Sequence, residues 1–328
     1  MVSDGDWYTE SSDALGLGFS LKTRDKLHEE TSPFQSIAVY DTETFGRLMT
    51  IDGLVMLTER DNFLYHEMMT HPALLAHGAP ARVVIIGGGD CGTLREVLKH
   101  DTVASVMQID IDERVTRVAE RYFPRLTEAN DDPRATLAFI DGIEWMRNAS
   151  TDSADLIIID STDPIGPAEG LFNEAFYREC HRVLDTGGLM VQQSESPLVH
   201  QRLIADMSAA MQRAGFAATD LLSFPQPCYP TGWWSATLAR AEAREAGGWR
   251  PGSDAERGAR CVRRTQAAQE DPGSRYSSST RSTAQLRDRW RRPTPARSST
   301  PSPARFRAAR PTSLPQPQPL PRPLPRSQ

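Results

Sequence analysis

The sequence predicts an α/β protein whose main domain is a doubly wound parallel sheet, preceded by a small antiparallel β domain. Three features of its 328 residues lead to this prediction. From residue 80 onward, short apolar runs alternate with helical segments, which is typical of a parallel sheet covered on both faces. A glycine-rich turn follows the first of these runs, where such sheets bind nucleotides. Residues 1–60, in contrast, contain short β-rich runs separated by turn residues.

Residues 1–60 are expected to form the N-terminal β domain. An Asp52-Gly53 pair separates two of its runs, and Asp-Gly between β-rich runs is a strong hairpin signal. We expect a small antiparallel sheet from the strands 36–40, 47–51 and 54–57.

Residues 61–240 are expected to form the doubly wound domain. Its first helix runs from residue 61 to about 76, and Leu64, Met68 and Leu75 are expected to form the buried stripe. A Gly-Gly pair at 187–188 is expected to close a later helix over 172–184. The predicted strands are 82–86, 104–110, 135–140, 155–160 and 189–193, and a further helix covers 198–214.

Residues 241–328 differ in composition from the rest of the chain. They carry 18 Arg, no Lys and 13 of the 24 prolines. Such a segment cannot bury enough apolar surface to offset the entropy lost on ordering, so we expect it to be disordered. Its Arg, Pro, Ser and Ala bias also resembles a GC-rich gene translated in the wrong frame. We therefore add the hypothesis that a frameshift replaced the native C-terminus.

The first 240 residues are strongly acidic, with 19 Lys+Arg against 36 Asp+Glu. This balance disfavours nucleic acid and anionic membranes as partners and suits a cationic ligand. No apolar run approaches the ~20 residues that cross a bilayer, and no signal peptide is apparent. We expect a reduced, cytoplasmic protein, because no Cys-x-x-Cys pair occurs among Cys91, Cys180, Cys228 and Cys261.

The pattern Gly87-x-Gly89-x-x-Gly92 directly follows the first strand of the predicted parallel sheet and opens a helix. It matches the Rossmann-like fingerprint, in which glycines let the backbone approach a nucleotide closely. Asp110 ends the next strand, where a carboxylate can accept hydrogen bonds from both ribose hydroxyls. The combination indicates an adenosine-containing ligand but does not separate NAD from S-adenosyl compounds.

Asp90 places a carboxylate in this turn, where a pyrophosphate would otherwise bind. Two like charges ~4 Å apart at an effective dielectric of ~20 repel each other by roughly 4 kcal/mol. The residue therefore disfavours NAD, and it disfavours S-adenosylmethionine, whose own carboxylate approaches the turn. It favours a ligand that brings an ammonium group instead. The alternative is that Asp90 only caps the following helix.

A second acidic motif, Asp160-Ser161-Thr162-Asp163, follows the fourth predicted strand. The carboxyl ends of parallel strands line one crevice, so we expect Asp160 beside the glycine-rich turn. Two carboxylates there can hold a cation, share a proton or bind a metal, and the alternative is a loop that caps a helix. Asp141, after the third strand, adds an acid at which an adenine amino group could be recognised.

Aromatic and histidine residues complete the set of candidates. The loop from Tyr229 to Trp234 suits an alkylammonium ligand through cation–π contacts, although a core hairpin would explain it equally well. Tyr65 and His66 flank the buried stripe of the first helix and are placed to reach a ligand. His66 and His71 are separated by about 140° around a helix, so no metal site is expected from them.

Four of these segments together resemble the spermidine synthases, the polyamine aminopropyltransferases. The resemblance covers roughly residues 8–240 and implies a methyltransferase-like doubly wound domain, usually in a homodimer or homotetramer. It implies transfer of an aminopropyl group from decarboxylated S-adenosylmethionine to putrescine, giving spermidine and methylthioadenosine. No tightly bound cofactor, metal, nucleic acid or membrane is expected to take part. The segments are Gly87-Gly-Gly-Asp-Cys-Gly92, Asp110-Ile-Asp112, Asp160-Ser-Thr-Asp-Pro-Ile-Gly-Pro167 and Tyr229-Pro-Thr-Gly232.

The resemblance also assigns roles to individual residues. Asp160 matches the family's proton acceptor, and Asp110 stands where many members have Glu. The family's usual C-terminal Tyr-Tyr-Asn element does not occur in this sequence. The donor nucleoside is expected to contact Gln35, Gly87, Gly89, Asp90, Asp110, Asp141, Gly142 and Pro167. The amines are expected to contact Tyr65, His66, Asp90, Asp160, Ser161, Thr162, Asp163, Gln193 and Tyr229.

Other functions stay open at this point. An S-adenosylmethionine-dependent diamine N-methyltransferase would use the same kind of domain, and a non-catalytic polyamine-binding protein would use the same acidic crevice. A NAD-dependent dehydrogenase is weaker because of Asp90. The sequence leaves the acceptor open among putrescine, cadaverine, agmatine and spermidine.

Overall fold

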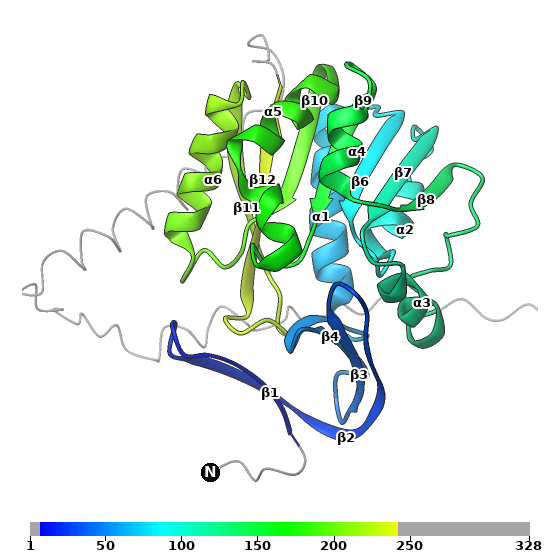
Figure 1. Cartoon of the computed structure of the whole chain (residues 1–328), viewed down its shortest axis with the longest axis vertical. Coiled ribbons are helices and arrows are strands. Elements are labelled where there is room, and N and C mark those ends of the chain that lie inside the picture. Colours follow the sequence, from blue (N-terminus) through cyan, green and yellow to red (C-terminus); the bar gives the residue numbers. More distant parts are fainter. Residues whose placement is uncertain (1–6, 242–328) are drawn as a thin grey trace, which may run out of the picture. The chain divides into compact units, whose positions relative to one another are not determined.

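The computed structural model describes residues 7–241, which contain two separate β-sheets (Figure 1). The first has five antiparallel strands and belongs to the N-terminal part of the chain. The second has seven strands and belongs to the following α/β part. The predictions of disorder or a frameshift beyond residue 241 lie outside the described residues.

The N-terminal sheet has its strands in chain order, and Asp52 and Gly53 form the turn between the last two, with φ of 50° and 78°. The predicted hairpin is therefore confirmed. The first two strands were not predicted, because the second mixes charged and apolar residues and buries only Leu21. The strands are β1 (Trp7–Ser12), β2 (Leu17–Thr31), β3 (Ser36–Thr42), β4 (Arg47–Ile51) and β5 (Leu54–Thr58).

The seven-stranded sheet has the order β11-β12-β10-β9-β6-β7-β8. The five strands from β6 to β10 run parallel, as predicted. The doubly wound fold is therefore confirmed, and the sheet continues at one edge with β12, which lies antiparallel between β10 and β11. The strands are β6 (Arg82–Gly87), β7 (Ser105–Asp110), β8 (Ala135–Phe139), β9 (Ala154–Asp160), β10 (Leu184–Gln193), β11 (Ala218–Pro225) and β12 (Trp233–Arg240).

Helices cover both faces of this sheet, because its central strands are apolar on both sides. Val83 and Ile85 face one core together with α1 and α2, whereas Val84 and Ile86 face the other with α4, α5 and α6. Figure 1 shows the last three on one side of the sheet. The helices are α1 (Asn62–His77), α2 (Gly92–Leu98), α3 (Glu113–Tyr122), α4 (Gly142–Asn148), α5 (Glu174–Val183) and α6 (Gln201–Arg213), with a 3-10 helix η1 (Gly166–Phe172) before α5.

The buried side of α1 differs from the prediction. Leu75 is 73% exposed, and Leu64 and Met68 are only partly buried. Apolar residues occur on more than one side of this helix, so their spacing did not fix its rotation. The structure turns the helix so that Tyr65 and His66 face the sheet, and the stripe that is buried consists of Tyr65, Met69, Ala73 and Leu74.

A third core joins the two parts of the described chain. Val39 and Met49 of the N-terminal sheet pack with Val115 and Val118 of α3. Because α3 follows β7, this contact places the N-terminal sheet over the carboxyl ends of the parallel strands. The crevice predicted at those ends therefore has a second wall.

Candidate active site

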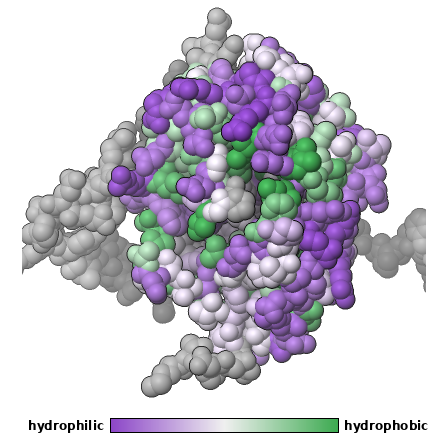
Figure 2. All heavy atoms as spheres, in the orientation of Figure 1, coloured by the Kyte–Doolittle hydropathy of each residue, from purple (hydrophilic) through white to green (hydrophobic). Residues whose placement is uncertain are grey.

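A cavity of about 340 Å³ lies between the carboxyl ends of the parallel strands and the N-terminal sheet. The sheet contributes apolar residues such as Met49 and Met56, and the strand ends contribute carboxylates. Figure 2 shows hydrophobic side chains gathered near the middle of the visible face, with hydrophilic ones around them. The predicted residues that line this cavity are Gln35, Tyr65, Gly87, Gly89, Asp90, Asp110, Asp141, Gly142, Asp160, Ser161, Thr162, Asp163 and Tyr229.

Two predicted site residues, His66 and Gln193, lie elsewhere. His66 is 1% exposed and stands outside the cavity lining, in contact with Asp90. Gln193 lines a second, smaller cavity. The backbone of Pro167 belongs to η1, and its neighbours Gly166 and Ala168 line the main cavity.

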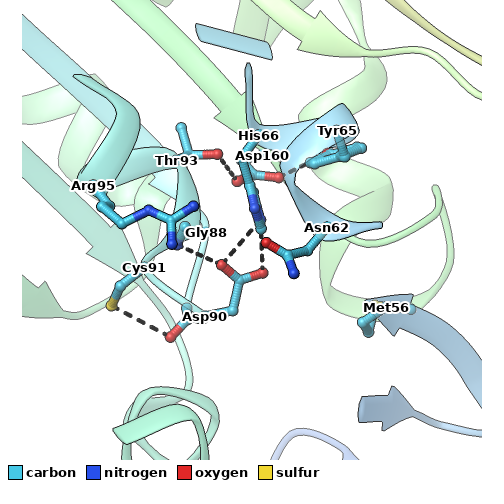
Figure 3. A network of polar contacts seen from close by, with 12 residues as sticks. Met56, Asn62, Tyr65, His66, Gly88, Asp90, Cys91, Thr93, Arg95 and Asp160 are labelled. Atoms are coloured by element: carbon cyan, nitrogen blue, oxygen red, sulfur yellow. Dashed lines mark hydrogen bonds and ion pairs between the residues drawn. The ribbon is translucent and has the colours of Figure 1, made fainter. Parts of the chain in front are cut away.

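Asp160 stands at the end of β9 and is held by two side-chain hydroxyls (Figure 3). The Tyr65 hydroxyl donates to its Oδ1 at 2.7 Å, and the Thr93 hydroxyl donates to its Oδ2 at 2.6 Å. Thr93 is not among the site residues that the sequence predicts. Its signal is its place in the first turn of the helix that the glycine-rich turn opens.

The environment of Asp160 favours its protonated form. Burial raises the pKa of this carboxyl, and the negative charge of Asp90 raises it further. His66 and the hydroxyls of Thr93 and Tyr65 oppose the shift only in part. A carboxylate with a raised pKa can take a proton from a substrate more easily than an ordinary aspartate.

Asp90 lies one residue before Cys91, the N-cap of α2, and lines the cavity. Its Oδ1 accepts a hydrogen bond from the Gly92 backbone N–H at 2.6 Å and lies 3.2 Å from His66 Nε2. Burial alone would raise the pKa of Asp90, but the charge of His66 and its hydrogen bond hold that pKa below its ordinary value. Burial also works against the charged imidazole, yet Asp90 raises the pKa of His66 overall. The alternative that Asp90 only caps the helix is wrong, because Cys91 is the N-cap residue and Asp90 lines the cavity.

The glycine-rich turn lets these groups approach one another. A Cβ on Gly92 would lie 2.3 Å from the His66 ring, so any other residue would displace the histidine. A Cβ on Gly87, which has φ of 82°, would lie 2.1 Å from the Asp160 backbone oxygen. Gly92 is therefore needed to leave room for His66, which contacts the Asp90 carboxylate. Gly87 is needed to leave room for the backbone of Asp160.

Asp110 lies at the end of β7, with its carboxylate against Gly89. Burial, supported by the charges of Asp112, Asp160 and Asp90, raises its pKa to about 6, although a hydrogen bond from the Asp112 N–H opposes the shift. Gln35 reaches the same place from the N-terminal sheet, where its Nε2 donates to Asp112 Oδ2 at 3.0 Å. These positions suit the predicted contacts to a ribose.

Asp141 marks the start of α4, where its Oδ1 accepts hydrogen bonds from the backbone N–H groups of Ile143 and Glu144. The residue and Gly142 line the main cavity on the Asp110 side of the sheet. A Cβ on Gly142 would lie 2.8 Å from Ile86 Cγ2, so only glycine fits between α4 and β6 here.

A second cavity, of about 40 Å³, shares one wall with the main cavity, but Gly87, Gly88, Gly89 and Asp90 line only the main one. Asp163 and Tyr229 line both cavities, and Tyr229 donates to the Met56 backbone oxygen at 2.9 Å. The predicted aromatic loop is the connection between β11 and β12, so it is a hairpin and also a cavity wall. Glu10, which no sequence motif indicated, reaches this cavity from β1.

His71 lies away from the site, as expected from its spacing to His66. Its Nδ1 lies 2.9 Å from His100 Nε2, and its Nε2 lies 3.2 Å from Glu96 Oε2. Among residues 7–241, Glu67, His71 and Glu96 bring possible metal ligands within 4.8 Å of one another. Both Glu96 oxygens already accept hydrogen bonds from the Lys99 ammonium, so we propose no metal site there.

Comparisons with known proteins show the family of this chain. The model of the spermine/spermidine synthase domain matches residues 62–246, and that of the spermidine synthase tetramerisation domain matches residues 6–59. The chain belongs to the spermine/spermidine synthase family. The predicted resemblance is therefore confirmed, and the molecule is an enzyme of the aminopropyltransferase class.

Individual members of the spermine/spermidine synthase family give the same result. A polyamine aminopropyltransferase of Methylococcus capsulatus is 64% identical over 75% of this chain and 89% of its own length. One of Thioalkalivibrio sulfidiphilus is 60% identical over 73% and 84%. A crystal structure of a spermidine synthase with the transition-state analogue AdoDATO has a TM-score of 0.72 and 33% identity, covering 76% of this chain and 85% of that one.

Proposed function

We propose that this chain transfers the aminopropyl group of decarboxylated S-adenosylmethionine to one amine of putrescine, giving spermidine and methylthioadenosine. The observation that carries the proposal is the position of Asp160, which is held by Tyr65 and Thr93 in a cavity that also contains Asp90 and Asp110. One such cavity can bind an adenosine at one end and amines at the other.

The donor is expected to lie along the parallel strand ends. Asp110 accepts hydrogen bonds from the ribose hydroxyls, and the apolar side chains of the N-terminal sheet cover the nucleoside. Asp90 binds the ammonium of the aminopropyl group, and a donor with a carboxylate at that place is repelled. This charge preference disfavours S-adenosylmethionine and NAD.

The acceptor amine attacks the carbon next to the sulfonium. The new C–N bond forms as the C–S bond breaks, the sulfur leaves as the neutral thioether of methylthioadenosine, and Asp160 receives the proton of the amine directly or through water. A free alkylammonium has a pKa of about 10 and an ordinary Asp one of about 4, so unaided transfer would be uphill by roughly 8 kcal/mol. The raised pKa of Asp160 and the neighbouring sulfonium reduce this difference.

Positioning supplies most of the acceleration, because the sulfonium is already an activated leaving group. We keep the prediction that no metal takes part, and a chelator is expected to leave turnover unchanged.

The decisive experiment is mass spectrometry of the products formed from each donor. With decarboxylated S-adenosylmethionine and a mixed diamine pool, the acceptor should gain one aminopropyl group. A gain of one methyl group from S-adenosylmethionine would instead support the diamine N-methyltransferase. Calorimetric binding of polyamine without any turnover would support the non-catalytic alternative.

Assembly and location complete the proposal. The match to a tetramerisation domain over residues 6–59 indicates an oligomer, and we propose a homodimer or homotetramer formed through the N-terminal sheet. Mass photometry of the protein would distinguish the two. Within residues 7–241, none of the helices combines the length and hydrophobicity that a membrane crossing requires. The cytoplasmic location stays a prediction.

A further inference from the structure

Asp112 is a buried carboxylate that has no role in the reaction as described above. The residue is 2% exposed and stands two positions after Asp110, where α3 begins. It does not belong to the lining of the main cavity, so it does not touch a ligand bound there. Any effect of Asp112 on a ligand therefore passes through the groups that it binds.

One carboxylate oxygen of Asp112 binds its own helix. Its Oδ1 accepts a hydrogen bond from the Arg114 backbone N–H at 3.0 Å, which makes Asp112 the N-cap of α3. Serine and asparagine cap helices about as well as aspartate does. Capping alone therefore does not require a charged residue at this position.

The other carboxylate oxygen of Asp112 binds the N-terminal sheet. Its Oδ2 accepts hydrogen bonds from Ser32 Oγ at 2.6 Å and from Gln35 Nε2 at 3.0 Å. Ser32 begins the turn between β2 and β3, and its Oγ also accepts the backbone N–H groups of Phe34 and Gln35. The turn and the Gln35 amide are therefore fixed together on a single oxygen of Asp112.

Asp112 also binds Asp110 at the other wall of the main cavity. The Asp112 backbone N–H donates to Asp110 Oδ1 at 2.8 Å. Gln35 and Asp110 both line the main cavity, the first from the N-terminal sheet and the second from the end of β7. Asp112 thus holds one side chain from each wall, and both are predicted to contact the nucleoside.

The charge of Asp112 acts on Asp110 as well. Burial is the main cause that raises the pKa of Asp110 to about 6, and the charge of Asp112 adds to it, although the Asp112 N–H opposes the shift. Removing the charge while keeping the N–H should therefore lower the pKa of Asp110. A residue that only supported the fold would leave this pKa unchanged.

We propose that Asp112 is a positioning residue for the donor, which holds Gln35 and Asp110 at the spacing that the nucleoside requires. The inference rests on the proposed function, because the nucleoside belongs to the donor of that reaction. The acceptor end should be unaffected, because neither Asp160 nor Asp163 is a hydrogen-bond partner of Asp112 within the described chain.

The test compares D112S and D112N with R114Q. Serine keeps the N-cap but is too short to reach Gln35, whereas asparagine keeps the cap and can donate to the Gln35 amide oxygen once that amide turns over. R114Q is the control, because the Arg114 guanidinium joins the same two elements through Glu30, at 2.7 and 2.8 Å, and the substitution keeps the backbone N–H that is capped.

The Kd for methylthioadenosine is measured by calorimetry across pH, and KM and kcat are measured with the donor and with putrescine. At pH 7.5 we expect D112S to raise this Kd and the KM for the donor by about tenfold. kcat and the KM for putrescine should stay within about twofold. D112N should recover most of the lost affinity, and R114Q should bind methylthioadenosine like the wild type.

The pH profile supplies the second readout. In D112S and D112N the pH midpoint of methylthioadenosine binding should fall by about one unit, because Asp110 loses its charged neighbour. R114Q should keep the wild-type midpoint. A folded D112S, verified by thermal melting, that keeps both the wild-type Kd and the wild-type midpoint would overturn the proposal.

A double-mutant cycle isolates the contact with Gln35. If Asp112 acts through this residue, D112S should weaken methylthioadenosine binding much less in a Q35A background than in the wild type. Equal losses in both backgrounds would count against the proposal. A wild type that binds methylthioadenosine but transfers no aminopropyl group would contradict the proposed function alone, whereas a wild type that does not bind it would contradict both.

Discussion

His66 Nε2 lies 3.2 Å from Asp90 Oδ1, and of these two residues Asp90 alone lines the main cavity. The imidazole therefore acts on a ligand through the carboxylate that it holds. Because the pKa of His66 is raised and that of Asp90 lowered, the pair favours the charged form of both groups. His66 is thus a positioning residue, and its role in amine binding remains a prediction.

Replacing His66 by Gln should make donor use more sensitive to acid. Without the imidazolium, burial and Asp160 raise the pKa of Asp90, and a protonated Asp90 no longer attracts the donor's ammonium. The acid limb of kcat/KM for decarboxylated S-adenosylmethionine is expected to move up by about one pH unit. H71Q, on the same helix but outside the cavity, serves as the control. An H66Q profile that coincides with the wild-type profile would contradict this role.

Replacing Asp160 by Asn should remove turnover while the nucleoside still binds. Loss of a general base lowers kcat by roughly 10²–10⁴-fold. Methylthioadenosine binding, measured by calorimetry, should stay within about twofold because Asp110 and the apolar walls are unchanged. T93V removes one of the two hydroxyl donors to Asp160 and should have a smaller effect on kcat. Near-normal kcat in D160N would rule out the proton-acceptor assignment.

Methylthioadenosine binding should weaken as the pH falls through 6. The pKa of Asp110 is raised to about 6, so its carboxylate is ionised above that pH. In that form it is expected to accept charge-assisted hydrogen bonds from the ribose. Protonation replaces these with weaker neutral bonds, which corresponds to about a tenfold increase in Kd. Calorimetry at pH 5 and 7.5 measures the change. D110N should bind methylthioadenosine weakly at both pH values. A wild-type Kd that does not change with pH would contradict the prediction.

Glu195 should destabilise the protein at alkaline pH. Its side chain is 3% exposed, and burial, with repulsion from Asp163, raises its pKa from 4.5 to about 9. Its contribution to stability is therefore fully present below pH 4.5 and is lost as the pH rises toward 9. At pH 7 the loss amounts to about 3 kcal/mol of the free energy of unfolding. E195Q should therefore melt several degrees higher than wild type at pH 8 but not at pH 4.5.

The control for Glu195 is E128Q, which changes an exposed glutamate in the same way. It should melt like the wild type at both pH values. A lower melting temperature for E195Q at pH 8 would show that the ionised carboxylate stabilises the fold, for example through His200, whose Nδ1 lies 3.3 Å away.

The sequence predicted best what local patterns specify. The five parallel strands and the Asp52-Gly53 hairpin were correctly predicted, because apolar runs and turn residues mark them directly. The rotation of α1 was wrong, because apolar residues on several sides of a helix leave its orientation to tertiary packing. The alternation of strands and helices gave no sign of β12, which pairs antiparallel with β10 beyond the predicted parallel strands.

In the site, too, local sequence patterns predicted some residues and only tertiary packing brings in the others. Asp90, Asp110 and Asp160 follow strand ends, so topology alone predicts that they converge. Thr93 is a polar residue in a helical turn with no signal beyond its position. Glu10 lies on a strand far from the motifs in sequence, and only the packing of the N-terminal sheet brings it to Asp163.

The position of β12 affects how the polypeptide folds as the ribosome makes it. β11 pairs with β12 alone, so it has no partner in the sheet until residues 233–240 have emerged. Until then β10 presents an open edge, which could pair with another nascent chain and aggregate. A transcript cut before this last strand would thus yield a protein that lacks Trp234, which lines the smaller cavity. Its sheet would also keep an open edge at β10, even though all the residues predicted to bind the nucleoside are present.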